Sequence, residues 1–312
     1  MTPQTIFFNE HERLRSGWRF TVFLISYIIF ASFLTGIFVS ILSKIPAATG
    51  QNSLLTMVGS FSIFTFCAIF LGWFYGKYFE DLPFRALGVW ITKNWFKNLL
   101  LGLIVGTASI GLAALIPFLS GALSFQSNLS AGSSPILLTL SVTLLIFIAG
   151  AVSEEALFRG YLLQTMSRAK LFFVGVFLTS VLFASVHNAN PGANLFSWLN
   201  TFLAGIWFCI AYWKTRDLWF PIGIHLAWNW VQGSILGINV SGLGELATAP
   251  LMRSQDFGPV WLTGGSYGLE AGISCTIALI VSSVAIWFLP FPKPTEEMLE
   301  MTSEEKPNRI GE

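Results

Sequence analysis

Two glutamates and an arginine stand close together inside an otherwise apolar stretch of the chain. Glu154, Glu155 and Arg159 all lie in the sequence SEEALFRGY. An ionised side chain costs about 2.5–3.5 kcal/mol at the centre of a bilayer by insertion scales, so membrane segments rarely carry one without a function. These residue types in these surroundings therefore indicate acid–base chemistry at a site inside a membrane.

The two adjacent glutamates are expected to differ in role. Consecutive side chains on a helix point about 100° apart, so the two carboxylates cannot face one cavity equally. Glu155 and Arg159 are four residues apart and can form an ion pair on one helix face. Glu154 has no cation on its own face and is free to act as a general base. The alternative is a structural ion-pair network in which all three residues join helices.

Two histidines lie in later apolar segments, His187 in FASVHN and His225 in GIHLAWNW. Phe183 precedes His187 by four residues, so its ring can wall the same pocket and fix the imidazole. Asn229 follows His225 by four residues and places an amide donor on the same helix face. These groups suit hydrolysis, in which a carboxylate and an imidazole deprotonate water while an imidazole and an amide stabilise the oxyanion.

Three motifs in a fixed order carry a family resemblance. EEALFR fits the pattern EExxxR, FASVH fits FxxxH and HLAWN fits HxxxN. In this order they resemble the motifs of the CPBP family, the CAAX proteases and bacteriocin-processing enzymes that include the Ras-converting CAAX endopeptidase. The resemblance covers roughly residues 135–289, and GGSYGLEAG before the last apolar segment is similar to the family's Gly-rich fourth motif.

The resemblance implies an intramembrane glutamic endopeptidase with about eight helices. By this resemblance, Glu154 and His187 would activate water, and His225 and Asn229 would form the oxyanion hole. The supporting residues would be Glu155, Arg159 and Phe183.

The resemblance also bears on cofactors and substrate. No cofactor is expected, because an oxyanion site that contains asparagine requires no metal. Zinc on Glu154, His187 and His225 is the alternative, since a carboxylate and two imidazoles form an acceptable zinc set. The substrate would be a membrane-associated peptide or protein, either of the prenylated CAAX type or with a leader peptide.

The composition is that of a protein with several membrane helices. Of 312 residues, 54% are hydrophobic and 11% are charged, whereas soluble domains contain about 25% charged residues. The net charge of +1 gives no argument for binding nucleic acid. We expect an all-α, polytopic bundle of about eight transmembrane helices, surrounded by lipid, in the bacterial cytoplasmic membrane.

Eight apolar segments approach or exceed the length of about 20 residues that a bilayer requires. They are expected at Trp18–Leu42, Ser53–Tyr75, Trp95–Ser120, Pro135–Met166, Leu171–Asn188, Ala193–Trp213, Leu218–Ile238 and Tyr267–Leu289. With the amino terminus inside, fourteen lysines and arginines fall on the inner face and only Lys44 and Arg253 on the outer face. This asymmetry follows the positive-inside rule and predicts that both termini are cytoplasmic.

These segments predict three parts of the chain. Residues 1–134 would form three transmembrane helices with an amphipathic loop, residues 135–290 the catalytic core, and residues 291–312 a disordered cytoplasmic tail. The fourth segment is expected to continue into water beyond Arg159. Glu270, near the outer end of the last segment, is expected to cap that helix, because a negative charge is favoured at a helix amino terminus.

Two other functional classes are compatible with these residues. A catalytically silent protein of the same fold could act as a regulator, a scaffold or a bacteriocin self-immunity factor. A transporter that uses the carboxylates for proton coupling is less favoured, because the sequence shows no inverted repeat.

Counting about 1.5 Å per residue from the inner loops places Glu154, His187 and His225 about 20, 25 and 11 Å deep, so tilted helices are needed to bring them together.

Overall fold

The fold is an assembly of packed helices, described here from a computed structural model. The structure describes residues 6–45, 54–244 and 246–305, and the chain is 73% helical, which confirms the all-α prediction. The longer helices are α2 (Ser16–Leu42), α3 (Leu54–Glu80), α4 (Trp95–Leu119), α5 (Ser133–Glu155), α7 (Phe172–Val186), α8 (Leu195–Thr215), α9 (Trp219–Trp230) and α11 (Ile273–Phe288). The shorter elements are α6 (Leu163–Arg168), α10 (Val260–Thr263), α12 (Glu296–Thr302) and the strands β1 (Leu123–Ser127) and β2 (Met252–Asp256).

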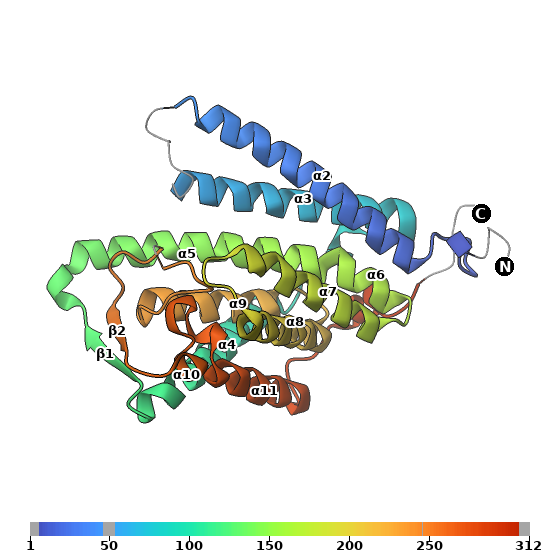
Figure 1. Ribbon diagram of the computed structural model, residues 1–312. Coiled ribbons are helices and arrows are strands. Elements are labelled where there is room, and N and C mark those ends of the chain that lie inside the picture. Colours follow the sequence, from blue (N-terminus) through green and yellow to red (C-terminus); the bar gives the residue numbers. More distant parts are fainter. Residues whose placement is uncertain (1–5, 46–53, 245, 306–312) are drawn as a thin grey trace.

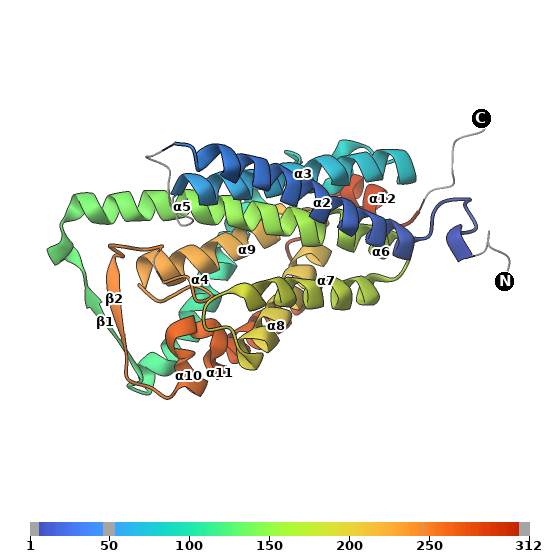
Figure 2. The same cartoon turned by 45° about the horizontal axis from the view of Figure 1, so that its top comes forward.

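The helices lie in two groups on either side of α5. The hairpin of α2 and α3 lies on one side, and α4, α8, α9 and α11 lie on the other (Figures 1 and 2). The described residues contain six helical stretches long and apolar enough to cross a membrane, at Ser16–Leu42, Leu54–Glu80, Trp95–Leu119, Ser133–Arg168, Phe172–Ala189 and Leu195–Thr215. The protein is a multi-pass integral membrane protein, as its composition predicts.

Two of the eight predicted segments form shorter helices than expected. The seventh, predicted at Leu218–Ile238, consists of α9 and a π-helical turn, Val231–Ile235. The eighth, predicted from Tyr267, begins only at Ile273. Gly268 has a φ of +101°, which a right-handed helix excludes, so the helix can begin only after it. Apolar composition alone therefore overestimates the helical length of both segments.

Close packing between α4 and α9 places α9 in the interior of the bundle. A Cβ atom on Gly102 would lie 2.4 Å from the carbonyl oxygen of Phe220, and one on Gly223 would lie 2.4 Å from that of Leu99. Only glycine allows two helix backbones to approach this closely. The crossing therefore holds His225, which is 6% exposed, inside the protein instead of at the lipid surface.

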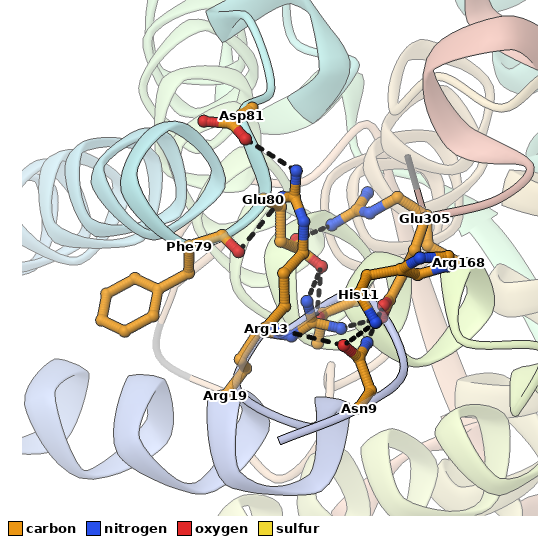
Figure 3. A network of polar contacts seen from close by, with 10 residues as sticks. Asn9, His11, Arg13, Arg19, Phe79, Glu80, Asp81, Arg168 and Glu305 are labelled. Atoms are coloured by element: carbon orange, nitrogen blue, oxygen red, sulfur yellow. Dashed lines mark hydrogen bonds and ion pairs between the residues drawn. The ribbon is translucent and has the colours of Figure 1, made fainter. Parts of the chain in front are cut away.

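A buried cluster of charged side chains joins several parts of the chain at one end of the molecule (Figure 3). Glu80, at the end of α3, lies 3.1 Å from Arg19 of α2 and also pairs with Arg168 at the end of α6. Arg19 pairs in addition with Glu305, beyond α12. Each of the first three side chains is almost fully buried. Buried charges need such partners, so the cluster fixes these segments relative to one another.

The carboxyl-terminal tail is ordered over residues 291–305, where the sequence predicts disorder. Thr295 accepts a hydrogen bond from the backbone N–H of Met298 at the start of α12. Met298 and Thr302 are four residues apart, share one helix face and are fully buried. The prediction of disorder is therefore wrong for this part of the tail. Residues 306–312, and Ser53 at the start of the second predicted segment, lie outside the described residues.

A further prediction about a connecting segment is wrong. The fourth segment does not continue into water beyond Arg159, because residues 156–168 are all buried against neighbouring elements. The loop between α9 and α11 contains the strand β2, which pairs with β1 in antiparallel register, with Leu123 opposite Asp256. Each strand has only five residues, too few for a clear alternating pattern.

Removing the charge of Glu80 should destabilise the protein strongly. Glu80→Gln leaves the buried guanidinium groups of Arg19 and Arg168 without a full counter-charge, and breaking a buried pair costs about 3–5 kcal/mol. Glu297→Gln is the matched control, because its ion pair with Arg85 is exposed and exposed pairs contribute at most about 1 kcal/mol. Thermal unfolding in detergent measures the difference, and equal shifts for the two variants would contradict this role of Glu80.

Another buried acid, Asp217, fixes the start of α9. Its carboxylate accepts hydrogen bonds from the Asn98 amide at 2.6 Å and from the backbone N–H of Trp219 at 3.1 Å. Burial raises the pKa of Asp217 from 3.8 to about 6. Between about pH 4 and about pH 6 the Asp217 carboxyl group is therefore ionised in the unfolded chain but still protonated in the folded protein. The contribution of this group to the free energy of unfolding falls as the pH rises through that range.

The Asp217→Asn variant lacks this titration. We expect the stability of D217N relative to the unaltered protein to rise by on the order of 2 kcal/mol as the pH rises through this range, and to be constant at higher pH. Thermal unfolding of both proteins across the range checks this result. A stability difference that does not change with pH would contradict the raised pKa of Asp217.

Candidate active site

The predicted catalytic residues line one cavity inside the membrane-spanning part of the protein. Glu154 comes from the end of α5, His187 from the turn that ends α7, and His225 and Asn229 from α9. The ring of Phe183 also lines the cavity, which has a volume of about 370 Å³. The structure therefore brings these side chains together from three helices.

π-Helical turns follow two of the three motif-bearing helices, α5 and α9. Directly after Glu155 the chain becomes π-helical over Ala156–Leu162, where Gly160 leaves the helical region with a ψ of −123°. A second π-helical turn, Val231–Ile235, follows α9. Such turns insert an extra residue and are frequent at functional sites. Arg159 lies in the first turn and is fully buried, so its side chain remains in the interior.

Glu154 faces both histidines. Its Oε2 atom lies 3.8 Å from Nε2 of His225 and 4.0 Å from Nε2 of His187. This oxygen is buried and has no hydrogen-bond partner among the residues that the structure describes, although the side chain as a whole is 26% exposed. A water molecule hydrogen-bonded to two atoms leaves them about 4–4.6 Å apart. The spacing is therefore close to that of a carboxylate and an imidazole that share one water.

His187 is held by the backbone of its own helix. Its Nδ1 lies 2.7 Å from the carbonyl oxygen of Phe183, and the two rings are 4.7 Å apart between centroids. Because a carbonyl oxygen can only accept a hydrogen bond, Nδ1 carries the hydrogen. In the neutral ring Nε2 is then an acceptor. His187 therefore presents a basic nitrogen to the space beside Glu154.

His225 is held by a carboxylate instead of a carbonyl. Its Nδ1 lies 2.9 Å from Oε1 of Glu155, and the ring of Phe208 stacks on the imidazole with centroids 4.7 Å apart. A carboxylate oxygen accepts this hydrogen bond, so Nδ1 of His225 carries a hydrogen. The two histidines are therefore held by different groups, although both present Nε2 to Glu154.

Glu155 has two partners where the sequence predicts one. The same Oε1 atom lies 3.2 Å from Nη1 of Arg159. Arg159 also donates to the carbonyl oxygen of Gly205 at 3.0 Å, and its guanidinium group lies 4.9 Å from the ring centroid of Phe208. Spacing along one helix identifies the pair of Glu155 and Arg159. It gives no signal for His225 or for the α8 residues, which approach only in the folded chain.

The cavity also contains groups that could serve as nucleophiles. Ser241 and Cys275 line its wall. Within residues 6–45, 54–244 and 246–305, neither forms a hydrogen bond with an imidazole, and Ser241 contacts Glu270 instead. A serine or cysteine nucleophile requires a hydrogen-bonded base, so the cavity is better suited to attack by water.

Glu270 does not cap the last helix, contrary to the prediction. It lies in the short turn Leu269–Ala271, and the residue before α11 is Gly272. Its Oε2 atom accepts a hydrogen bond from the amide of Gln232 at 2.6 Å, and Oε1 accepts one from the backbone N–H of Ser241 at 3.3 Å. Glu270 therefore belongs to the wall of the same cavity.

The counted depths from the inner loops do not prevent the side chains from meeting. Glu154 and His187 lie at similar counted depths, and His225 is the exception. The turn that precedes α9 is buried, with Asp217 2% exposed and Leu218 0% exposed. α9 therefore begins inside the protein instead of at its surface. In addition, α4 and α8 run obliquely to α5 (Figures 1 and 2).

A zinc site at Glu154, His187 and His225 would need closer donor atoms than this structure provides. Donors in a tetrahedral zinc site are about 3.4 Å apart. The Glu154 oxygen is instead 3.8 and 4.0 Å from the two imidazole nitrogens. Among the residues that the structure describes, no group of three or more His, Cys, Asp or Glu side chains is arranged to hold a metal ion. The residues do not form a zinc site in this geometry, and no step below involves one.

Comparison with known sequences bears on the same region. Residues 135–231 match the family described as type II CAAX prenyl endopeptidase Rce1-like. This segment is similar to that family. It contains every predicted site residue from Glu154 to Asn229, and Glu270 lies outside it. An uncharacterised 24.3 kDa protein of Escherichia coli is 27% identical over 186 residues, which are 57% of this chain and 78% of that protein. No solved structure gives a significant match.

The adjacent glutamates should differ sharply in their contribution to stability. Glu155→Gln leaves Arg159 buried without a full counter-charge, which costs about 3–5 kcal/mol. Glu154→Gln removes a carboxylate whose Oε2 has no hydrogen bond within the described part of the chain, and should change stability by less than about 1 kcal/mol. Thermal unfolding of the two variants checks this difference. Equal losses would show that Glu155 does not hold the site in the way its contacts indicate.

Proposed function

We propose that the protein is an intramembrane glutamic endopeptidase that cleaves a membrane-associated substrate with a water molecule activated by Glu154 and His187. The observation that carries this proposal is the position of Glu154 Oε2. This atom is buried, has no hydrogen bond to any described residue and lies within 4.0 Å of an imidazole nitrogen from each of two other helices. The match of residues 135–231 to the Rce1-like family supports a CAAX-type protease.

The first step is the attack of water on the scissile carbonyl group. Glu154 takes a proton from the water molecule, while the unprotonated Nε2 of His187 accepts its second hydrogen and orients it. The water oxygen then bonds to the carbonyl carbon, and the carbonyl oxygen becomes negatively charged.

The second step is the collapse of the tetrahedral intermediate. The amide of Asn229 and the Nε2–H of protonated His225 would donate hydrogen bonds to the oxyanion. Glu155 supports this role by stabilising the charged ring from the Nδ1 side. When the C–N bond breaks, the proton held by Glu154 passes to the leaving amine, and Glu154 returns to its starting state.

The proposed substrate is a membrane-associated protein or peptide, of the prenylated CAAX type or with a leader peptide. The cavity lies among membrane-spanning helices, and its lining includes apolar side chains such as Phe61, Phe64 and Leu279. Such a lining suits apolar groups beside the scissile bond. We place the protein in a bacterial cytoplasmic membrane, with the positively charged end of the bundle facing the cytoplasm.

Peptide release by the purified full-length protein in lipid vesicles tests this function. Glu154→Gln should reduce kcat by about 10²–10⁴-fold, the usual contribution of a general base. Asn229→Ala should reduce kcat by about 10²–10³-fold, the usual effect of removing one oxyanion donor. Asp256→Asn removes an exposed acid on β2 and is the control that should keep full activity.

Two outcomes would contradict the proposal. Full activity of E154Q would exclude Glu154 as the base, and absence of cleavage by the unaltered protein would favour a catalytically silent scaffold or immunity factor. Inhibition by a chelator that zinc reverses would contradict the metal-free mechanism.

A further inference from the structure

Glu270 is a second buried carboxylate in the cavity, and the proposed reaction does not use it. The residue is 8% exposed and lines the cavity together with Ser241, Asn190 and Asn200. An ionisable side chain buried in a membrane protein is costly and generally has a partner that explains it. A partner for the carboxylate of Glu270 is therefore expected.

The described part of the protein gives this carboxylate only neutral partners. Oε2 accepts from Gln232 at 2.6 Å, and Oε1 accepts from the backbone N–H and the hydroxyl of Ser241 at 3.3 and 3.4 Å. Among the described residues Glu270 forms no ion pair, and no lysine or arginine lines the cavity. Glu80 and Glu155, in contrast, are both paired with arginine. Neutral donors orient a carboxylate but do not cancel its charge.

The backbone around Glu270 holds the carboxylate in a fixed place. A Cβ atom on Gly268 would lie 2.0 Å from the carbonyl oxygen of Asn239, so only glycine permits the close approach of these two loops. The amide of Asn200, on α8, donates to the carbonyl oxygen of Glu270 at 2.9 Å. The carboxylate is thus oriented in advance, which is the property expected of a binding group.

We propose that Glu270 is a specificity-determining residue that binds a basic side chain, lysine or arginine, of the peptide substrate. This inference rests on the proposed endopeptidase function. A carboxyl group buried among neutral donors holds either a proton or a cation. An ammonium or guanidinium group would supply the missing charge through a short charge-assisted hydrogen bond. The apolar lining of the cavity accepts the methylene stem of such a side chain.

A set of membrane-anchored, quenched fluorescent peptides tests this subsite. One position at a time carries either lysine or norleucine, which has a similar length but no ammonium group. The unaltered full-length protein should cleave one lysine peptide with a kcat/KM at least about tenfold above that of its norleucine counterpart, the range of a charge-assisted hydrogen bond. Equal rates at every position would overturn the proposal.

Three variants assign that preference to Glu270. Glu270→Gln should reduce the lysine-to-norleucine ratio to about one, and Glu270→Asp, which keeps the charge, should retain part of the preference. Asp256→Asn removes an exposed acid from β2 and should keep the full ratio. An unchanged ratio in E270Q, or loss of folding in E270Q together with no preference in E270D, would show that Glu270 only joins the loops.

Binding of the same peptides to the Glu154→Gln protein separates this inference from the proposed function. Tighter binding of the lysine peptide, with no cleavage by the unaltered protein, would refute the endopeptidase and leave the subsite in place. Cleavage by the unaltered protein with equal binding of both peptides would refute the subsite and leave the endopeptidase in place.

Discussion

The site depends on a single buried carboxylate, that of Glu155. One of its oxygens contacts both the guanidinium group of Arg159 and Nδ1 of His225, so it links α5 to α9. Arg159 continues the link to α8 through the carbonyl oxygen of Gly205. Glu155, Arg159 and His225 would each be unfavourable in this interior without a partner. They are stable there because each is partnered, and this pairing fixes the direction in which His225 presents Nε2 to Glu154.

Pairing also divides four glutamates of this protein into two kinds. Glu155 and Glu80 contact arginines, do not line the catalytic cavity and hold helices together. Glu154 and Glu270 form no contact with an arginine or lysine among the described residues, and both line that cavity. A carboxylate that the fold does not neutralise is available to a proton, to water or to a ligand. Contact with an arginine therefore separates the glutamates that hold helices together from the glutamates that are proposed to bind water or substrate.

Much of the fold could be predicted from the sequence, because long apolar runs and the distribution of basic residues constrain a membrane protein strongly. The pair of Glu155 and Arg159 could be predicted because both lie on one helix. The contact of Glu155 with His225 could not, since it depends on a glycine crossing and a buried turn at Asp217 that have no local signal. The prediction that Glu270 caps the last helix is wrong for the same reason, because the position of Glu270 depends on the fold of a glycine-rich loop.

The protonation of the site histidines tests this account most directly. The chain has only three histidines, so nitrogen NMR of histidine-labelled protein in lipid can be assigned with single substitutions. The contacts of His187 with a carbonyl oxygen and of His225 with a carboxylate predict a proton on Nδ1 of both rings, with Glu155→Gln shifting the resonances of His225 and not those of His187. A His187 ring protonated only at Nε2, or a His225 ring protonated only at Nδ1, would contradict the assigned roles of the two histidines.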